Sequence, residues 1–395
     1  MRILLATDWN SGRGGAEALA LWLRDGLEAA GDSVRLLTSS AGSAGDGRAE
    51  YVAYGSERRA AQALLQLVNP FAVARARQVV REFAPDVALV NMFAQQLSPA
   101  FLHALGDVPI VLSVSDFKCV CPIGTKLLRD GSLCRQRAGL VCLTSGCVGS
   151  LHWLRDRPRY ALMRSGVRRV ARIVACSDWI CRALVADGIP AEVVMLPVPP
   201  PGPSYRRAPA ATPTLLFCGR LDVEKGVALL LRAFARVRAQ SADARLRIVG
   251  RGPQRAALER LARELGSEAA VTFTGWLEPA QVEAELARAW ALVAPSLLAE
   301  PLGLVAPEAI VRSVPVIASA HGGFGETVND GRTGLLFPNG DENALTEQLL
   351  RVVRGAAFAD HTIEPALVAA AADRHALGRY VGRMRALSRD VIASA

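Results

Sequence analysis

Long hydrophobic runs are missing from this sequence. No apolar stretch approaches the roughly 20 residues that a membrane-spanning helix needs. The N-terminus reaches an aspartate at Asp8, too early for a secretory signal. Aromatic residues make up 6% of the chain and hydrophobic residues 51%, which is the composition of a globular protein. We therefore expect a folded cytoplasmic protein, and its 395 residues predict two domains.

The glycine pattern of dinucleotide-binding proteins is also absent. Ile3–Thr7 is predicted to be a strand, and Gly12-Arg13-Gly14-Gly15 follows it closely. This sequence does not fit G-x-G-x-x-G, in which the glycines allow a tight turn and the close approach of a diphosphate. A dehydrogenase is therefore disfavoured.

Paired C-x-x-C motifs are missing as well, although cysteine is not scarce. Five of the eight cysteines lie within 29 residues: Cys119, Cys121, Cys134, Cys142 and Cys147. Disulfides are disfavoured in the cytoplasm, where clustered thiols more often bind metal. Because the spacing is not that of the common zinc folds, two interpretations stay open: a metal site, and reduced cysteines that pack.

Acidic residues are outnumbered, which gives a formal net charge of +9. The excess gathers between Arg155 and Arg172, where seven arginines accompany a single carboxylate, Asp156. Such a patch suits anionic lipid, a pyrophosphate-bearing acceptor or nucleic acid, or it is a solvated helix face. Nucleic-acid binding predicts aromatic residues among the arginines, and only Trp153 and Tyr160 are near.

Short apolar segments alternate with helical segments along the chain. The predicted strands are Ile3–Thr7, Val34–Thr38, Val87–Val90, Pro109–Val114, Arg172–Ser177, Val193–Leu196, Leu215–Cys218, Leu246–Gly250, Val271–Thr274, Ala291–Ala294, Val316–Ala318 and Gly334–Phe337. Apolar strands separated by helices predict parallel sheets covered on both faces. We expect an α/β fold of two doubly wound Rossmann-like domains that face each other across a cleft, where open α/β sheets bind ligands.

Proline marks the expected division between these domains. Seven prolines lie between Pro197 and Pro213, and neither a helix nor a strand tolerates so many missing N–H donors. We expect an N-terminal domain at 1–197 with a cysteine-rich insertion at 117–150. A linker at 198–213, a second domain at 214–372 and a terminal helix at 373–395 follow.

One loop in the second half carries two cations. In Gly219–Gly226, Arg220 and Lys225 precede a helix, where backbone N–H groups already favour an anion. The planar fork of an arginine and the point charge of a lysine suit a diphosphate. A salt-bridged turn with Asp222 and Glu224 is the alternative.

A second loop, 295–309, places two glutamates eight positions apart, Glu300 and Glu308. Pro307 suits the first turn of a helix that carries Glu308. Two carboxylates directed into one cleft accept hydrogen bonds from hydroxyls, as sugar recognition requires. The alternative is that Glu308 only meets the dipole of its own helix.

Six motifs in this order carry a family resemblance. They are Gly-Arg-Leu…Glu-Lys-Gly at 219–226, Val-Gly-x-Gly-Pro at 249–253, Phe-Thr-Gly at 273–275, Glu-x7-Glu at 300–308, Gly-Gly-x-x-Glu at 322–326 and Asn-Asp-Gly-x-Thr-Gly at 329–334. A Gly-Gly-x-Glu loop at 14–17 adds to them. Over nearly its whole length the chain resembles the retaining family-4 glycosyltransferases (group 1) of the two-Rossmann-domain type, GT-B, and is most similar to bacterial surface-polysaccharide members.

The resemblance implies transfer of a sugar, with retention, from a UDP- or GDP-sugar to a glycan or a polyprenyl-linked acceptor. No metal is implied for catalysis, and the terminal helix is expected to return to the N-terminal domain. Arg220 and Lys225 would bind the diphosphate, Glu308 the ribose and Glu300 the donor sugar. The other implied donor-binding residues are Gly14, Gly15, Gly219, Gly250, Gly252, Gly275, Trp276, Leu302, Gly303, Leu304 and Val305.

The chain departs from the family pattern at two positions. Ser115 stands where a histidine that touches the donor sugar is common, so the family does not fix which sugar the donor carries. Asp116, the next residue, becomes the candidate catalytic residue of the N-terminal domain. Leu302 replaces the usual phenylalanine of the second loop, which is an apolar exchange.

The cysteine-rich segment resembles an insertion near the acceptor side of surface-polysaccharide enzymes. The implied structural zinc ligands are Cys121, Cys134, Cys142 and Cys147, with reduced packing cysteines as the alternative. Arg164, Arg168 and Arg172 follow at helical spacing, which implies a peripheral contact of the 155–172 patch with anionic membrane. A nucleotide-sugar epimerase on the same scaffold and a glycosyltransferase with a natural-product acceptor stay open, although the Glu-x7-Glu loop disfavours the epimerase.

Overall fold

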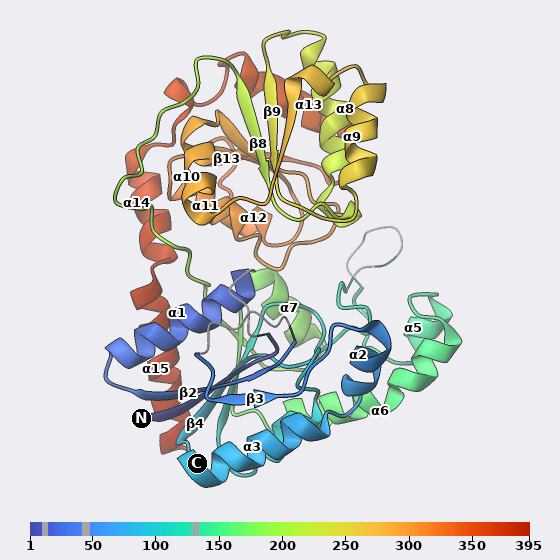
Figure 1. Cartoon of the computed structure of the whole chain (residues 1–395), viewed down its shortest axis with the longest axis vertical. Coiled ribbons are helices and arrows are strands. Elements are labelled where there is room, and N and C mark those ends of the chain that lie inside the picture. The colour runs from blue at the N-terminus through green and yellow to red at the C-terminus, as the bar shows by residue number, and fades with distance from the viewer. Residues whose placement is uncertain (10–14, 42–47, 127, 129–133) are drawn as a thin grey trace. The chain divides into compact units, whose positions relative to one another are not determined.

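The computed structural model describes residues 1–9, 15–41, 48–126, 128 and 134–395. Its contacts divide the chain into two compact units. Unit 1 comprises Met1–Pro197 together with Leu377–Ala395, and unit 2 comprises Val198–Ala376. Each unit contains one parallel sheet covered by helices, which confirms the doubly wound α/β prediction (Figure 1).

The sheet of unit 1 has seven strands in the order β3-β2-β1-β4-β5-β6-β7. They are β1 (Arg2–Thr7), β2 (Ser33–Ser39), β3 (Tyr51–Ala53), β4 (Val87–Met92), β5 (Ile110–Val114), β6 (Arg172–Ala175) and β7 (Glu192–Val193). The central strand β1 is buried from Ile3 to Thr7, because helices cover both faces of the sheet. The strand order reverses between β1 and β4, and this is the point at which doubly wound sheets bind ligands.

Eight helices of unit 1 are described. They are α1 (Gly15–Ala29), α2 (Arg59–Leu65), α3 (Pro70–Phe83), α4 (Ala100–Ala104), α5 (Leu140–Thr144), α6 (Ser150–Val167), α7 (Asp178–Ala186) and α15 (Leu377–Ala393). Asn69 caps α3, since its side-chain oxygen accepts from the amides of Phe71 and Ala72. Among the described helices of the whole chain, none is both long and apolar enough to cross a membrane.

The last helix, α15, belongs to unit 1, which confirms its expected return to the N-terminal domain. It packs against α1, and Arg385 Nε donates to Asp32 Oδ2 at 2.7 Å. The helix begins at Leu377 rather than at residue 373, because the chain first ends another helix, α14 (Pro365–Arg374), in unit 2.

The sheet of unit 2 has six parallel strands in the order β10-β9-β8-β11-β12-β13. They are β8 (Thr214–Cys218), β9 (Arg245–Val249), β10 (Val271–Gly275), β11 (Ala291–Ala294), β12 (Val316–Ser319) and β13 (Gly334–Phe337). Its helices are α8 (Val227–Arg238), α9 (Arg255–Glu264), α10 (Pro279–Arg288), α11 (Val305–Ile310), α12 (Phe324–Thr327), α13 (Glu342–Val353) and α14.

Two apolar cores lie on opposite faces of the unit 2 sheet. Leu215 and Phe217 of β8 pack with α8, α9 and α13, whereas Leu216 packs with α10, α11 and α12. This alternation follows from the period of two in a strand, which sends successive side chains to opposite faces. The burial on both faces explains why the strands are short, continuous apolar runs in the sequence.

The proline-rich segment 198–213 makes its contacts within unit 2. The amides of Ala208 and Ala210 donate to carbonyls at the end of α10, at 3.0 and 2.9 Å. Arg207 is partly buried and also donates to backbone carbonyls of unit 2. The segment expected as an interdomain linker, 198–213, is therefore hydrogen-bonded along unit 2, and the compact unit runs from 198 to 376.

Candidate functional site

Unit 2 reverses its strand order between β8 and β11, so the loops after these two strands flank the topological switch point. These are the loops that carry the charged residues singled out in the sequence. The loop after β8 contains Arg220 and Lys225, and the loop after β11 contains Glu300 and leads into α11 with Glu308. The fold thus brings both loops to one edge of one sheet.

The two loops meet at an ion pair. Lys225 Nζ lies 2.6 Å from Glu300 Oε1, and the two side chains are 27% and 13% exposed. Gly226 allows this approach, because it adopts a φ of +69° and an added Cβ would lie 1.9 Å from the carbonyl oxygen of Pro295. The amide of Leu297 also donates to the Glu224 carbonyl at 2.8 Å. A cation and a carboxylate that are 75 positions apart are therefore held as one group.

Glu300 keeps one oxygen available. Its Oε1 accepts from Lys225 and also from Ser296 Oγ at 2.6 Å. Its Oε2 has no hydrogen-bond partner within the described part of the chain. A carboxylate that is fixed on one side and open on the other is arranged to accept a hydroxyl from a ligand.

Backbone amides accompany this carboxylate. Leu302, Gly303, Leu304 and Val305 form the turn into α11, and in the described residues their N–H groups have no backbone or side-chain acceptor. Leu302 is 2% exposed, so its side chain belongs to the core rather than to the surface of the site. The amides at a helix start are hydrogen-bond donors with a partial positive charge.

Glu308 lies in α11, largely buried and without a salt-bridge partner among the described residues. Burial raises the pKa of Glu308 to about 7, and the positive charge of Arg312 opposes this shift. The alternative was that Glu308 only meets the dipole of its own helix. A helix N-terminus would lower the pKa of a carboxyl, so the alternative does not account for a pKa that burial raises. A perturbed carboxyl beside a ligand-binding edge is typical of a functional residue.

Arg220 differs from Lys225 in its exposure. Its guanidinium pairs with Asp222 at 3.1 Å, and its side chain is 73% exposed. The salt-bridged turn that competed with ligand binding in the sequence is thus present for Arg220, whereas Lys225 pairs across to the other loop. An exposed arginine in a surface ion pair contributes little to stability and can exchange its partner for an anion.

Glycines close the ends of the three neighbouring strands β8, β9 and β10. Gly219, Gly250 and Gly275 lie side by side, since the Gly250 amide donates to the Gly275 carbonyl at 2.8 Å and the Gly219 amide to Val249. Gly250 has a φ of +136°, and an added Cβ would lie 1.8 Å from the Gly219 carbonyl oxygen. At Gly250 this close packing of backbone leaves no room for a side chain in the strip that the three glycines form.

Beyond the glycines, Gly252 and Trp276 complete the strip. Gly252 packs against the backbone of Leu221. Trp276 is 47% exposed, and the Arg251 guanidinium lies 5.7 Å from its ring centroid. An exposed aromatic ring next to bare backbone can stack on a planar ligand.

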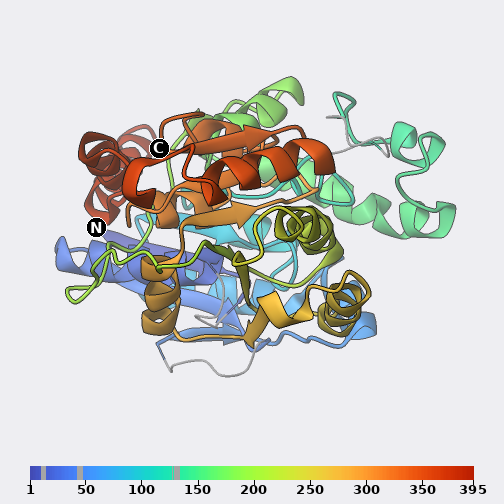
Figure 2. The same cartoon turned by 90° about the horizontal axis from the view of Figure 1, so that it is seen from above.

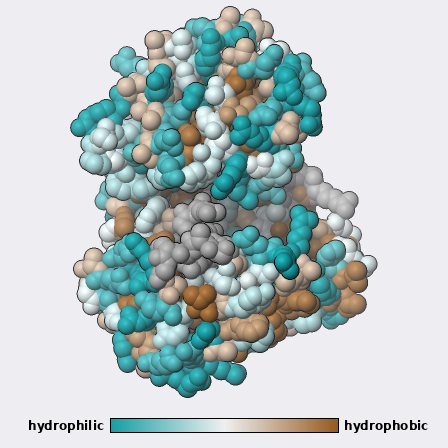
Figure 3. Space-filling view, viewed as in Figure 1, coloured by the Kyte–Doolittle hydropathy of each residue, from teal (hydrophilic) through white to brown (hydrophobic). Residues whose placement is uncertain are grey.

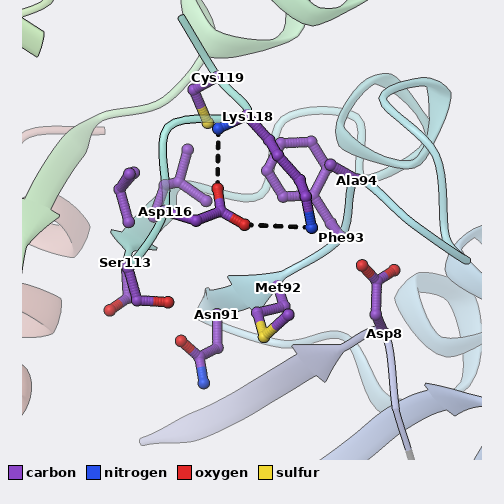
Figure 4. Close-up of a pocket in the computed structure, with 12 residues that line it drawn as sticks. Asp8, Asn91, Met92, Phe93, Ala94, Ser113, Asp116, Lys118 and Cys119 are labelled. Atoms are coloured by element: carbon purple, nitrogen blue, oxygen red, sulfur yellow. Dashed lines mark hydrogen bonds and ion pairs between the residues drawn. The ribbon is translucent and has the colours of Figure 1, made fainter. Parts of the chain in front are cut away.

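Unit 1 has a small pocket of about 20 Å³ at the corresponding edge of its sheet (Figure 4). Residues that follow β1, β4 and β5 line it, among them Asp8, Ser115 and Asp116. Asp116 accepts from the Lys118 amide at 2.9 Å through Oδ1, and its Oδ2 lies 3.3 Å from Lys118 Nζ. The candidate catalytic aspartate of this unit is therefore partly exposed and already paired.

Asp8 in the same pocket is a fully buried carboxylate that the sequence did not identify as important. Its Oδ1 accepts from the amides of Gln96 and Leu97 at 2.8 and 2.9 Å, and its Oδ2 accepts from Gln95 at 2.7 Å. Burial raises the pKa of Asp8, while these three amides act in the opposite direction. The signal available in the sequence was its position directly after β1, at the switch point.

The sequence predicted two donor-binding glycines in the N-terminal loop, Gly14 and Gly15. Gly14 lies outside the described residues, and Gly15 is the first residue of α1.

The four expected zinc ligands are all among the described residues. Cys121 and Cys142 are buried, and Cys134 and Cys147 are partly exposed. Within residues 1–9, 15–41, 48–126, 128 and 134–395, no three His, Cys, Asp or Glu side chains are grouped closely enough to hold a metal. The described geometry therefore supplies no support for zinc.

The arginine-rich patch does not form one helical stripe, which corrects the expectation from its spacing. Arg164 lies in α6, which ends at Val167, whereas Arg168 caps the helix and Arg172 begins β6. Arg159 is 8% exposed and donates to the Ala94 carbonyl at 3.0 Å, so it does not belong to the surface.

Two residues of the unit 2 site were missed in the sequence. Ser296 supplies the second hydrogen bond to Glu300, and its position four residues earlier in the same loop was the only signal. Arg312 lies one helical turn after Glu308, a spacing at which side chains on a helix face the same way. Neither residue has a distinctive motif of its own.

Known proteins match both units. A family model described as Glycosyl transferases group 1 matches residues 206–366, and one described as Glycosyl transferase 4-like domain matches residues 14–199. The D-inositol 3-phosphate glycosyltransferase of Nocardioides sp. is 39% identical over 178 residues, which cover 40% of this chain and 38% of that protein. The chain thus aligns with about two fifths of the length of this curated relative.

Solved structures match the whole chain. Sucrose-phosphate synthase from Thermosynechococcus elongatus has a TM-score of 0.72 at 21% identity, with 100% of both chains covered. Anabaena HepE in complex with UDP-glucose has a TM-score of 0.66 at 19% identity, again with 100% of both chains covered. At these identities the structures establish the fold, and the two family models identify the sequence. The chain belongs to the group 1 glycosyl transferases, which are family-4 glycosyltransferases of the GT-B fold.

Proposed function

We propose that this chain transfers a sugar, with retention, from a UDP- or GDP-sugar to a glycan or lipid-linked oligosaccharide in cell-surface polysaccharide synthesis. The observation that carries the donor assignment is the Glu300 carboxylate at the switch point of unit 2. One of its oxygens holds Lys225, and the other is open within the described residues. A hydroxyl of the donor sugar completes this arrangement.

The donor's other parts have matching groups in unit 2. Glu308 accepts hydrogen bonds from the ribose hydroxyls, and Arg220 and Lys225 receive the diphosphate. The base lies along the bare backbone at Gly250 and Gly275, next to Trp276. The structural relative that was solved with UDP-glucose supports a nucleotide sugar as the class of donor.

The transfer step follows from these positions. The acceptor hydroxyl forms a bond to the anomeric carbon on the face from which the diphosphate departs, and its proton passes to the departing phosphate oxygen. As the bond from the anomeric carbon to that oxygen breaks, negative charge develops on the diphosphate. Lys225, Arg220 and the amides from Leu302 to Val305 stabilise this charge, and fixed donors of this kind are effective because they need no reorganisation. These residues supply the stabilisation without a catalytic metal.

On the acceptor side we assign Asp116, which lines the unit 1 pocket beside Ser115. Lys118 Nζ lies 3.3 Å from Asp116 Oδ2 and fixes the side chain, whose carboxyl oxygens can accept a hydrogen bond from a hydroxyl. Asp116 orients the acceptor hydroxyl in this proposal, and the departing phosphate takes the proton.

The donor assignment is tested by titrating the intact chain with UDP-, GDP-, ADP- and TDP-sugars in a calorimeter. We expect one base to give measurable binding, and Glu308→Ala to abolish it. Unchanged affinity in Glu308→Ala would remove the ribose role. Product analysis with a labelled donor separates transfer from epimerisation, since an epimerase returns the label in a nucleotide sugar.

A peripheral contact with anionic membrane is the second part of the proposal, and it is assigned to α5 and the start of α6. These helices lie at the edge of unit 1 in both views (Figures 1 and 2). Leu140, Leu151 and Leu154 are 62%, 77% and 61% exposed, and Arg155 and Arg157 are exposed beside them. Figure 3 shows apolar residues gathered on this part of unit 1. Exposed leucines among arginines suit the surface of an anionic membrane, because leucines can enter the acyl layer while arginines pair with the anionic headgroups.

The membrane contact is tested by flotation with phosphatidylglycerol vesicles and phosphatidylcholine vesicles. We expect binding to the anionic vesicles alone, weakened by salt and lowered about tenfold or more by the pair Leu151→Ser and Leu154→Ser. Leu64→Ser is the matched control, because Leu64 is 69% exposed on α2. Equal losses in the control, or binding that ignores both lipid charge and salt, would contradict this assignment.

A further inference from the structure

Arg312 is a buried arginine that the transfer step does not use. It follows α11 by two positions and lies one turn after Glu308. Its side chain is 5% exposed. A buried guanidinium is costly unless its donors are satisfied, so the partners that satisfy it indicate what it holds together.

The guanidinium of Arg312 reaches two helices. Its Nε and Nη2 donate to Glu283 Oε1 at 3.1 and 2.6 Å, and Glu283 lies in α10. Its Nη1 donates to the backbone carbonyl of Glu308 at 3.0 Å. The planar fork therefore braces the Glu308 turn of α11 against α10.

The same guanidinium also holds the segment where the chain enters unit 2. Nη1 and Nη2 donate to the carbonyls of Pro199 and Pro200, each at 3.3 Å. Glu283 Oε1 accepts from the Gly202 amide at 3.0 Å, so the pair Arg312–Glu283 has bonds on both sides of this turn. The arginine is thus bonded to the helix that carries Glu308 and to the first residues of unit 2.

Arg312 is the charged group that favours the ionised form of Glu308. The other titratable groups that face this region are Cys218 and Glu285. Burial, together with the negative charges of Glu308 and Glu285, raises the pKa of the Cys218 thiol. Glu285 pairs with Arg247. Burial raises the pKa of Glu308, and the positive charge of Arg312 acts in the opposite direction. A protonated Glu308 would accept the ribose hydroxyls less well, because charged acceptors form the stronger hydrogen bonds.

We propose that Arg312 is a positioning residue of the donor site, which holds the Glu308 turn by its contact to the Glu308 carbonyl and keeps the carboxylate ready by its charge. It does not touch the donor. Because the proposed function assigns Glu308 to the ribose, the effect on donor binding rests on that function. The effect of Arg312 on the position and charge of Glu308 does not depend on the proposed function.

The test compares Arg312→Met, Arg312→Lys and Arg207→Met with the wild-type chain. The protonation midpoint of Glu308 is measured from the pH dependence of the stability difference between each background and the same background with Glu308→Gln. We expect Arg312→Met to move the midpoint upward by at least one pH unit and to weaken donor affinity at pH 7 at least tenfold, with partial recovery at pH 9. Arg312→Lys keeps the charge but not the fork, so its midpoint should stay near that of the wild type while donor affinity falls.

Arg207→Met is the matched control. Arg207 donates to the carbonyls of Leu286, Ala287, Ser313 and His361 in the same unit, and to no atom of Glu308. It should lower stability without moving the midpoint. An unmoved midpoint in Arg312→Met, or an equal shift in Arg207→Met, overturns the proposal.

Two further outcomes separate this proposal from the donor assignment. If the wild type binds no nucleotide sugar while the midpoint still moves in Arg312→Met, the proposed function fails and the hold of Arg312 on Glu308 stands. If Arg312→Met does not fold, Glu283→Gln and Arg312→Lys carry the test. Glu283→Gln leaves the guanidinium in place with a weaker partner, and an unchanged donor affinity in both of these variants overturns the proposal.

Discussion

The two sheets of this protein share a strand order at their centres, and each bears a carboxylate near its switch point. In unit 1 the carboxylate is Asp8, directly after β1. In unit 2 it is Glu300, in the loop after β11. Asp8 is fully buried, and its two oxygens accept hydrogen bonds from three backbone amides. The Glu300 side chain is 13% exposed, and within the described part of the chain only its Oε1 accepts hydrogen bonds, from Lys225 and Ser296.

The difference shows that the sheet topology determines where a carboxylate lies, whereas the surrounding loop residues determine which hydrogen bonds it makes. Backbone amides saturate Asp8, so this carboxylate fastens the loop after β4 to β1. Side chains hold only one side of Glu300, so its second oxygen has no hydrogen-bond partner among the described residues. A third carboxyl, Glu308, is largely withdrawn from water without such donors, and its raised pKa is the consequence. Variants of these three residues break or sharpen the comparison.

The largest expected effect is that of Asp8→Ala on stability. The substitution leaves three buried amides without an acceptor, and each costs about 1–3 kcal/mol. We expect the free energy of unfolding of unit 1 to fall by about 4 kcal/mol or more, measured by urea denaturation. Asp8→Asn keeps one acceptor oxygen and should lose less. A loss below about 1 kcal/mol in Asp8→Ala would mean that the amides find water instead.

Glu308→Gln should stabilise the fold at alkaline pH. Between the ordinary value of 4.5 and about 7, the unfolded chain releases a proton that the folded chain keeps, so wild-type stability falls as the pH rises through this window. The amide carries no such cost. We expect a gain of up to about 3 kcal/mol at pH 8 and none below pH 4.5, from thermal or urea unfolding at several pH values. A gain that does not vary with pH would show that folding does not raise the pKa of Glu308.

Arg220→Gln should have a moderate effect on the donor and almost none on the fold. Its ion pair with Asp222 is exposed, and such pairs contribute little to stability. A charge-assisted hydrogen bond to a phosphate is worth more, so we expect the donor KM to rise about tenfold in steady-state assays. A change in melting temperature without a change in KM would assign Arg220 to the turn alone.

The smallest expected effect is that of a chelator. Because Lys225, Arg220 and the amides before α11 are assigned to the diphosphate, transfer should change less than about twofold in EDTA. Loss of transfer that added Mg²⁺ or Mn²⁺ restores would show that a metal shares this role.

Sequence patterns located most of the fold because the strands are buried on both faces. β11 and β13 were predicted to the residue, since each is a short apolar run between turn residues. The helices α5 and α6 were not predicted. The first turns of α6 are exposed nearly all round, so they have no apolar stripe for a periodicity to reveal.

The candidate site in unit 2 could be picked out from the sequence as a set of residues, but not as an arrangement. Arg220, Lys225, Glu300 and Glu308 stood out by motif and by their places after strands. Which cation meets which carboxylate depends on the packing of loops that are 75 positions apart, and no local pattern records it. The role of Asp8 was hidden for a related reason, because its partners are backbone amides and any sequence provides those.

The most direct test of the donor site is calorimetric titration of the wild type and Glu300→Gln with the nucleotide sugar that binds best. The glutamine keeps the shape of the side chain but loses the charge that holds Lys225 and accepts the sugar hydroxyl. The account predicts at least 30-fold weaker binding, about 2 kcal/mol, with a melting temperature within about 2 °C of the wild type. Equal affinity in the two proteins, or no binding of any nucleotide sugar to the wild type, would contradict it.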